Sequence, residues 1–155
     1  MESSQVASAA PGGAYTREQL LELEAIKALT HRYALALDAF DVEATVGAFA
    51  PDAVFDCSAF GLPRLEGHDD LREFFDHNLQ AMANQMHLFA NHIIEFDAPD
   101  RARATNYLLQ DGYTKQGDRI QCLGLNRDRY VRTSSGWLIA ERTITPLVPP
   151  QLIGY

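Results

Sequence analysis

Two histidines lie five residues apart in one apolar stretch of the chain, His87-Leu-Phe-Ala-Asn-His92. An imidazole can move a proton near neutral pH, and it can also bind a metal. The surrounding segment is rich in Leu, Phe and Ile and is followed by turn-forming residues at 97–100, which predicts a strand. On a regular strand, residues five apart lie on opposite faces. We therefore expect no shared metal, and expect one histidine to face a pocket.

The composition limits the classes of partner. The chain has 155 residues, an apolar fraction of 46% and a formal net charge of −8. Nucleic acids and anionic membrane surfaces are bound by clustered Lys and Arg, so an acidic chain is not expected to bind either. No apolar run approaches the ~18 residues of a membrane-spanning helix. The length suits one domain with short tails, and we expect a hydrophobic small molecule as its partner.

The two cysteines, Cys57 and Cys122, belong to no CxxC motif. A chain of this size does not need a disulfide, so both are expected to be reduced thiols. Residues 1–14 lack the basic start and apolar core of a signal peptide. These features together predict a cytoplasmic protein.

Helical patterns come first in the chain and strand patterns follow. Thr16-Arg-Glu-Gln19 is a capping-box pattern, and apolar residues recur three or four apart from there to about 38–40, which predicts a long helix. Asp41 is a typical N-cap for a second helix. The other predicted elements are helix 42–49, strand 53–60, loop 61–67, helix 69–83 and strands 87–96, 101–113, 119–132 and 137–145. This order predicts an α+β fold.

These elements form a single domain over 16–146. We expect a disordered tail at 1–15, which is rich in Ser, Ala and Gly, and a second tail at 147–155. The C-terminal tail is apolar but contains three prolines between 146 and 150, so it cannot be a central strand. Two alternatives stay open: the tail frays, or it packs across a neighbouring subunit or the mouth of the pocket.

Several motifs resemble, in their order and spacing, the SnoaL-like branch of the nuclear transport factor 2-like superfamily. They are Tyr33-Ala-Leu-Ala-Leu-Asp38-Ala-Phe-Asp41, Phe49-Ala-Pro-Asp-Ala-Val-Phe-Asp56, Glu66-Gly-His-Asp-Asp-Leu-Arg-Glu-Phe-Phe75 and Gly136-Trp-Leu-Ile-Ala-Glu-Arg142. The resemblance covers about 17–145. It implies a cone-shaped α+β barrel, in which a strongly curved, mixed and mostly antiparallel sheet wraps around the N-terminal helices and encloses an apolar pocket. Such folds host enzymes and non-catalytic modules, so the function must be argued from the site.

Within that superfamily, the chain is most similar to cofactor-free dehydratases of the scytalone and bile-acid types. Tyr33 matches a helix tyrosine of the bile-acid type, while Asp38 and His87 match a carboxylate and an essential histidine found in both. Asp111 matches a further acid of the bile-acid type, and Asn126 a substrate-binding asparagine of the scytalone type.

Two departures from the scytalone type limit the expected substrate. Leu37 stands where that type has a tyrosine, and Gly124 stands where it has a serine. Scytalone itself is therefore not the expected substrate.

The resemblance implies elimination chemistry, which needs a base, an acid and a donor for the developing oxyanion. His87, held by Asp38, would act as base and then as acid. Tyr33 would stabilise the oxyanion or protonate the leaving group. Loss of water is the default reaction, and loss of formaldehyde from a hydroxymethyl group would need the same groups. The substrate would be aromatic or polycyclic and hydroxylated.

Strand alternation predicts which other side chains line the pocket. It places His87, Phe89, Asn91 and Ile93 on one face of their strand, and Thr105, Tyr107, Leu109 and Asp111 on one face of the next. Asp111 and Asn126 would bind polar substituents of the substrate. Phe55, Phe89 and Leu125 would shape the apolar part of the pocket.

Two alternatives stay open. An isomerase of the ketosteroid type would use Tyr33 with Asp56 as base and Asp128 as a protonated acid, although Arg127 and Arg129 beside Asp128 favour its charged form. A non-catalytic ligand-binding module would not need His87 and Asp38 to meet. The distance between those two side chains is therefore informative.

No cofactor is expected. The sequence contains no P-loop or GxGxxG motif, and its histidines do not converge, so neither a nucleotide, a flavin nor a metal is implied. We expect a homo-oligomer, with a trimer favoured and a dimer as the alternative. The dehydratases that the chain resembles are trimers, and the apolar C-terminal tail offers an element for exchange between subunits.

Overall fold

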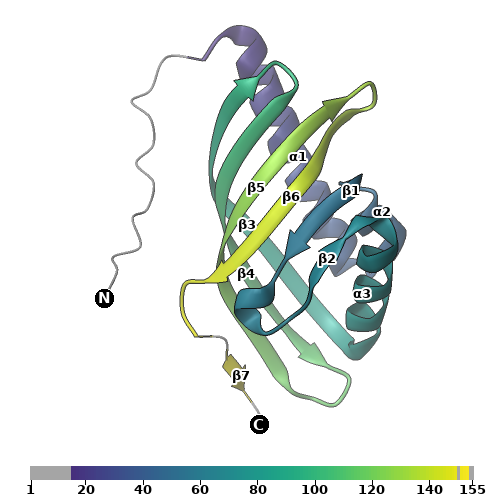
Figure 1. Ribbon diagram of the computed structural model, residues 1–155. Helices are drawn as coiled ribbons and strands as arrows, with labels where there is room; N and C mark the ends of the chain where they lie inside the picture. The colour runs from purple at the N-terminus through teal and green to yellow at the C-terminus, as the bar shows by residue number, and fades with distance from the viewer. Residues whose placement is uncertain (1–14, 150, 154–155) are drawn as a thin grey trace.

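The computed structural model describes residues 15–149 and 151–153. The elements are α1 (Arg17–Asp38), α2 (Val42–Val46), β1 (Phe49–Asp56), a 3-10 turn (Ser58–Phe60), β2 (Arg64–Glu66), α3 (Gly67–Ala81), β3 (Met82–Ala98), β4 (Arg101–Thr114), β5 (Arg119–Thr133), β6 (Gly136–Pro146) and β7 (Gln151–Ile153). One sheet has the order β2-β1-β6-β5-β4-β3, and only the β1–β6 pair in it is parallel. The long strands β3–β6 curve in front of α1, with α2 and α3 beside β1 and β2 (Figure 1). The predicted α+β cone is confirmed.

Helix α1 begins and ends as its sequence predicts. Thr16 accepts a hydrogen bond from the backbone N–H of Gln19, and the Gln19 side chain accepts one from Thr16 in return. At the other end, Phe40 adopts a left-handed φ of 59°, and the backbone N–H groups of Phe40 and Asp41 return to carbonyls of the last turn. Helix α1 therefore ends at Asp38, which lies on the side of the helix that contacts β3.

Several boundaries differ from the sequence prediction, and β3 begins at Met82 instead of 87. Helix α2 ends at Val46, and β1 begins at Phe49 and contains Pro51. The predicted loop 61–67 contains the short strand β2, which pairs with the end of β1. Part of the predicted C-terminal tail forms β7, which pairs antiparallel with Arg119–Gln121 of β5 beyond the end of β6. The expected disordered tail at 1–15 lies outside the described residues except for Tyr15.

A β-bulge in β3 overturns the expected placement of the two histidines. Asn91 has a φ of 56°, and the register with β4 shifts between Ala90 and Ile93. The extra residue shifts the alternation, so His87 and His92 both face α1, and Ile93, expected on the pocket face, is half exposed. They still do not share a site, because His92 packs against the His31 ring at 6.0 Å rather than lining the pocket.

A buried polar network lies in the core beneath the pocket. Arg142 and Asp128 form an ion pair, with Nε to Oδ1 at 2.7 Å and Nη2 to Oδ2 at 2.8 Å, and both side chains are fully buried. Asp128 also accepts hydrogen bonds from the hydroxyl of Tyr130 and the amide of Asn106. Its carboxylate is thus surrounded by donors, which is the arrangement that a buried charge requires.

Candidate active site

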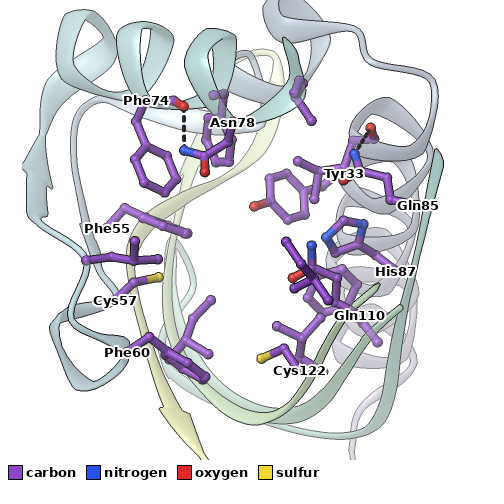
Figure 2. Close-up of a pocket in the computed structure, with 18 of the residues that line it drawn as sticks. Tyr33, Phe55, Cys57, Phe60, Phe74, Asn78, Gln85, His87, Gln110 and Cys122 are labelled. Atoms are coloured by element: carbon purple, nitrogen blue, oxygen red, sulfur yellow. Dashed lines mark hydrogen bonds between the residues drawn. The ribbon is translucent and has the colours of Figure 1, made fainter. Parts of the chain in front are cut away.

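A cavity of about 400 Å³ lies between α1, α3 and the concave face of the sheet. Its walls are mostly apolar, with a few polar side chains among them. They include Tyr33, Phe55, Cys57, Phe60, Phe74, Phe75, Asn78, Gln85, His87, Phe89, Leu108, Gln110, Gln121 and Cys122. Figure 2 shows Tyr33, His87 and Gln110 on one side of this space and Phe55, Phe74 and Cys57 on the other. Phe55 and Phe89 therefore lie where the sequence predicted them.

Asp38, at the end of α1, holds the cavity-lining His87 by two contacts. Asp38 Oδ1 lies 2.7 Å from His87 Nδ1, and Asp38 Oδ2 accepts a hydrogen bond of 3.1 Å from the His87 backbone N–H. A carboxylate can only accept, so the imidazole carries its proton on Nδ1. The lone pair of Nε2 is then free to act as a base, and His87 lines the cavity with only 8% of its side chain exposed.

Gln85 ties the same strand to the end of α1. Its amide nitrogen donates to the carbonyl of Leu37, at 2.5 Å, one residue before Asp38. The contacts through Gln85 and His87 hold β3 against the last turn of α1 at two points. The imidazole also stacks on Phe89, with ring planes 11° apart, so its orientation is fixed by packing as well.

Tyr33 supplies a protonated phenol to the cavity. Its ring is buried against Phe49 and Phe89, with ring centroids 5.5 Å and 5.7 Å away, and its hydroxyl points into the cavity (Figure 2). Burial raises the pKa of Tyr33 well above its ordinary value, which outweighs the opposite effect of Arg142, whose guanidinium lies 4.9 Å from the ring centre. The phenol thus remains a hydrogen-bond donor across the physiological pH range.

The expected contact of Asp111 with the pocket is wrong. Its carboxylate lies on the outer face of β4 and forms two hydrogen bonds with Arg119, which lower the pKa of Asp111. The cavity position belongs to Gln110, which pairs in register with His87. The alternation of charged Arg101 and Arg103 with small apolar residues already indicates that odd positions of this strand face solvent.

Leu125 and Asn126 also lie outside the cavity. Leu125 is on the outer face of β5, opposite the half-exposed Tyr107. Asn126 faces inward, but it is fully buried below the cavity, where its amide donates to Asn106. The exposed arginines at 127 and 129 mark the outward face of β5, and the same parity applied to Leu125 would have placed it correctly.

The isomerase alternative finds Tyr33 in the cavity but neither of its two acids, Asp56 and Asp128. The Asp56 side chain accepts a hydrogen bond from the backbone N–H of Ser58, and the cavity is lined instead by its neighbours Phe55 and Cys57. Asp128 is the carboxylate of the buried ion pair with Arg142. The partner of Asp128 is Arg142, not the neighbouring arginines that the sequence suggested.

The two thiols that line the cavity are not activated nucleophiles. Burial raises the pKa of Cys57 to about 12 and that of Cys122 to about 11, so both are protonated near neutral pH. Both cysteines are free. Within the described part of the chain, no group of three or more His, Cys, Asp or Glu side chains is arranged to hold a metal ion.

The comparison with protein families decides the relationship. The model of the SnoaL-like domain matches residues 18–143. The chain belongs to the SnoaL-like family. This SnoaL-like chain has no match among curated protein sequences. Its described part contains no helix that is both long and apolar enough to cross a membrane.

Solved structures of similar fold come from bacteria that include Novosphingobium aromaticivorans. A candidate aromatic ring hydroxylase from that organism is 30% identical to the SnoaL-like chain. The match covers 86% of the SnoaL-like chain and 94% of the hydroxylase chain, with a TM-score of 0.83. A candidate scytalone dehydratase from the same organism is 19% identical, with coverages of 88% and 90% and a TM-score of 0.79. A hexachlorocyclohexane dehydrochlorinase is 15% identical, with coverages of 88% and 92% and a TM-score of 0.78. The last two show likeness of fold alone.

Proposed function

We propose that this SnoaL-like protein is a cofactor-independent lyase that eliminates water from a hydrophobic, aromatic or polycyclic hydroxylated substrate. The observation that carries the proposal is the contact between Asp38 and His87. A histidine whose Nδ1 is held by a carboxylate, and whose Nε2 faces an apolar cavity, has the geometry of a general base. The names of two structurally similar proteins, a dehydratase and a dehydrochlorinase, also describe eliminations.

The proposed step uses three side chains. His87 Nε2 takes a proton from a carbon next to a carbonyl, and the electron pair forms a double bond as the neighbouring hydroxyl leaves. Asp38 stabilises the imidazolium that forms. Tyr33 donates a hydrogen bond to the developing enolate oxygen, and the proton on His87 passes to the leaving hydroxyl, which departs as water.

The cavity favours a neutral substrate. Among the described residues that line it, none is Lys or Arg, so a carboxylate or phosphate would enter without a counter-charge. Its volume of about 400 Å³ is at the small end of the range for ligand pockets, and its aromatic walls suit a flat ring system. The 30% identical structure is named for an oxidative reaction, and that name shares with the proposal only an aromatic substrate.

The proposal can be tested with 3-hydroxy-1-tetralone. This neutral bicyclic ketone carries an acidic C–H next to its carbonyl and a hydroxyl one carbon further along. Loss of water gives 1-naphthol after enolisation, and naphthol fluorescence reports the rate. We expect the purified protein to accelerate naphthol formation without added cofactor. A rate no faster than in buffer, together with saturable binding of the ketone, would favour the non-catalytic module instead.

A further inference from the structure

Asn78 presents a hydrogen-bond acceptor to the cavity from helix α3. Its amide nitrogen donates to the backbone carbonyl of Phe74, at 2.8 Å. A carbonyl oxygen only accepts, so this contact fixes which end of the amide faces the helix. The side-chain oxygen therefore points into the cavity, as Figure 2 shows. Among the described residues, it has no hydrogen-bond partner.

The surroundings of Asn78 do not explain why this position is polar. Neighbouring lining residues on α3 are Phe74, Phe75 and Leu79, and Phe55 lies close to Phe74, with ring centroids 5.9 Å apart. Asparagine has a low helix propensity, and the side-chain oxygen of Asn78, in the last turn of α3, has no partner in the described part of the chain that accounts for a polar residue here. Local violations of this kind are expected where a ligand is bound.

We propose that Asn78 selects substrates that carry a hydroxyl on the α3 side of the cavity, away from His87. The side-chain oxygen accepts a hydrogen bond from that hydroxyl, while the reacting part of the ring lies toward His87 and Tyr33. The ligand class is thus a neutral, flat ring system with a donor at the end opposite the reaction. The inference rests on the proposed function in one respect, that this cavity is the substrate site.

The test compares two naphthalenes of similar shape. In 2,6-dihydroxynaphthalene both ends carry a donor, whereas in 6-methoxy-2-naphthol one donor is replaced by an ether. Titrations that follow ligand fluorescence give the dissociation constants. We expect the wild-type protein to bind the diol about fivefold more tightly, as for one neutral hydrogen bond. Asn78→Leu should abolish this preference, and Asn78→Ala, a better helix former, should do the same.

Gln80→Leu is the control, because it also replaces a side-chain amide by leucine, but on the exposed side of the same helix. It should keep the preference for the diol. An unchanged preference in both Asn78 variants would overturn the inference, as would equal binding, or no binding, of both naphthols by the wild-type protein. Binding needs no proton transfer, so the result is independent of whether His87 catalyses. Catalysis by His87 is tested separately by the tetralone assay.

Discussion

The carboxylate of Asp38 engages His87 twice, through ring Nδ1 at 2.7 Å and through the backbone N–H at 3.1 Å. Asp38 is the last residue of α1, where the helix dipole disfavours a negative charge by about 0.3–1 kcal/mol. No basic residue in the last turn offsets that charge. The two contacts with His87 of β3 compensate the negative charge of Asp38. The contact with Nδ1 also sets the tautomer of the His87 ring.

Replacement of Asp38 by asparagine should remove most of the activity without unfolding the protein. The two contacts use different oxygens of Asp38, and in asparagine one of these oxygens becomes an NH2 donor, so both contacts cannot be kept. If the ring turns to its other tautomer, Nε2 carries the proton and is no longer a base. We expect kcat for the tetralone to fall by about 10²–10⁴-fold. Asp52→Asn, an exposed acid in β1, is the control and should retain the wild-type rate.

Tyr33→Phe isolates the hydroxyl from the ring. The ring contacts with Phe49, Phe75 and Phe89 remain, so the free energy of unfolding should change little. Without the donor, kcat should fall by about 10²–10³-fold. Since burial raises the pKa of Tyr33, the wild-type rate should not decline because of this group up to pH ~10. A full rate in the phenylalanine variant would remove Tyr33 from the proposed mechanism.

The buried ion pair should matter for stability far more than an exposed one. Arg142→Met leaves the carboxylate of Asp128 buried and unpaired, which typically costs about 3–5 kcal/mol. Arg129→Met removes the partner of Glu141 on the outer face, where the pair is exposed and 3.4 Å apart, and should cost less than about 1 kcal/mol. Urea denaturation of the two variants measures the difference. Similar losses in both would contradict the assigned roles.

The two cavity thiols predict a loss of stability at alkaline pH. Burial raises the pKa of Cys57 to about 12 and of Cys122 to about 11, whereas unfolded thiols titrate near pH ~8.5. Above that pH, the unfolded chain loses thiol protons that the folded protein retains, which favours unfolding. The two thiols therefore contribute fully to the free energy of unfolding below about pH 8.5, and this contribution decreases as the pH rises toward 11–12. A variant carrying both Cys57→Ala and Cys122→Ala should lose less stability than wild type between about pH 8 and 10. Equal losses would argue against this origin.

Local patterns predicted the helices and the long strands, because caps and periodic apolar residues act within a few residues of the chain. The capping box at Thr16 and the N-cap at Asp41 both form as expected. The faces of the strands were harder to predict. One left-handed residue, Asn91, reverses the alternation of β3, and nothing in its neighbours marks the bulge.

The candidate site was predicted in part. The resemblance to dehydratases, not a local pattern, brought Asp38 and His87 together from positions 49 residues apart in the chain. It failed at Asp111, because strand parity in this chain gives the cavity position to Gln110. Asn78 was missed, because a single asparagine in a helix pattern is usually a surface residue, and only the packing of α3 against the sheet shows that it lines the cavity. The cytoplasmic location and the homo-oligomer, with a trimer favoured, stay predictions, and sedimentation measurements would test the latter.

The most direct test of the central claim is the rate of tetralone dehydration by His87→Gln. Glutamine keeps a polar side chain of similar size but cannot act as a base near neutral pH. His77→Gln makes the same change on the exposed face of α3 and serves as the control. We expect kcat/KM to fall by about 10²–10⁴-fold in the first variant and to stay at the wild-type value in the second, with both folded by circular dichroism. A folded His87→Gln protein that turns over the ketone at the wild-type rate would contradict the account.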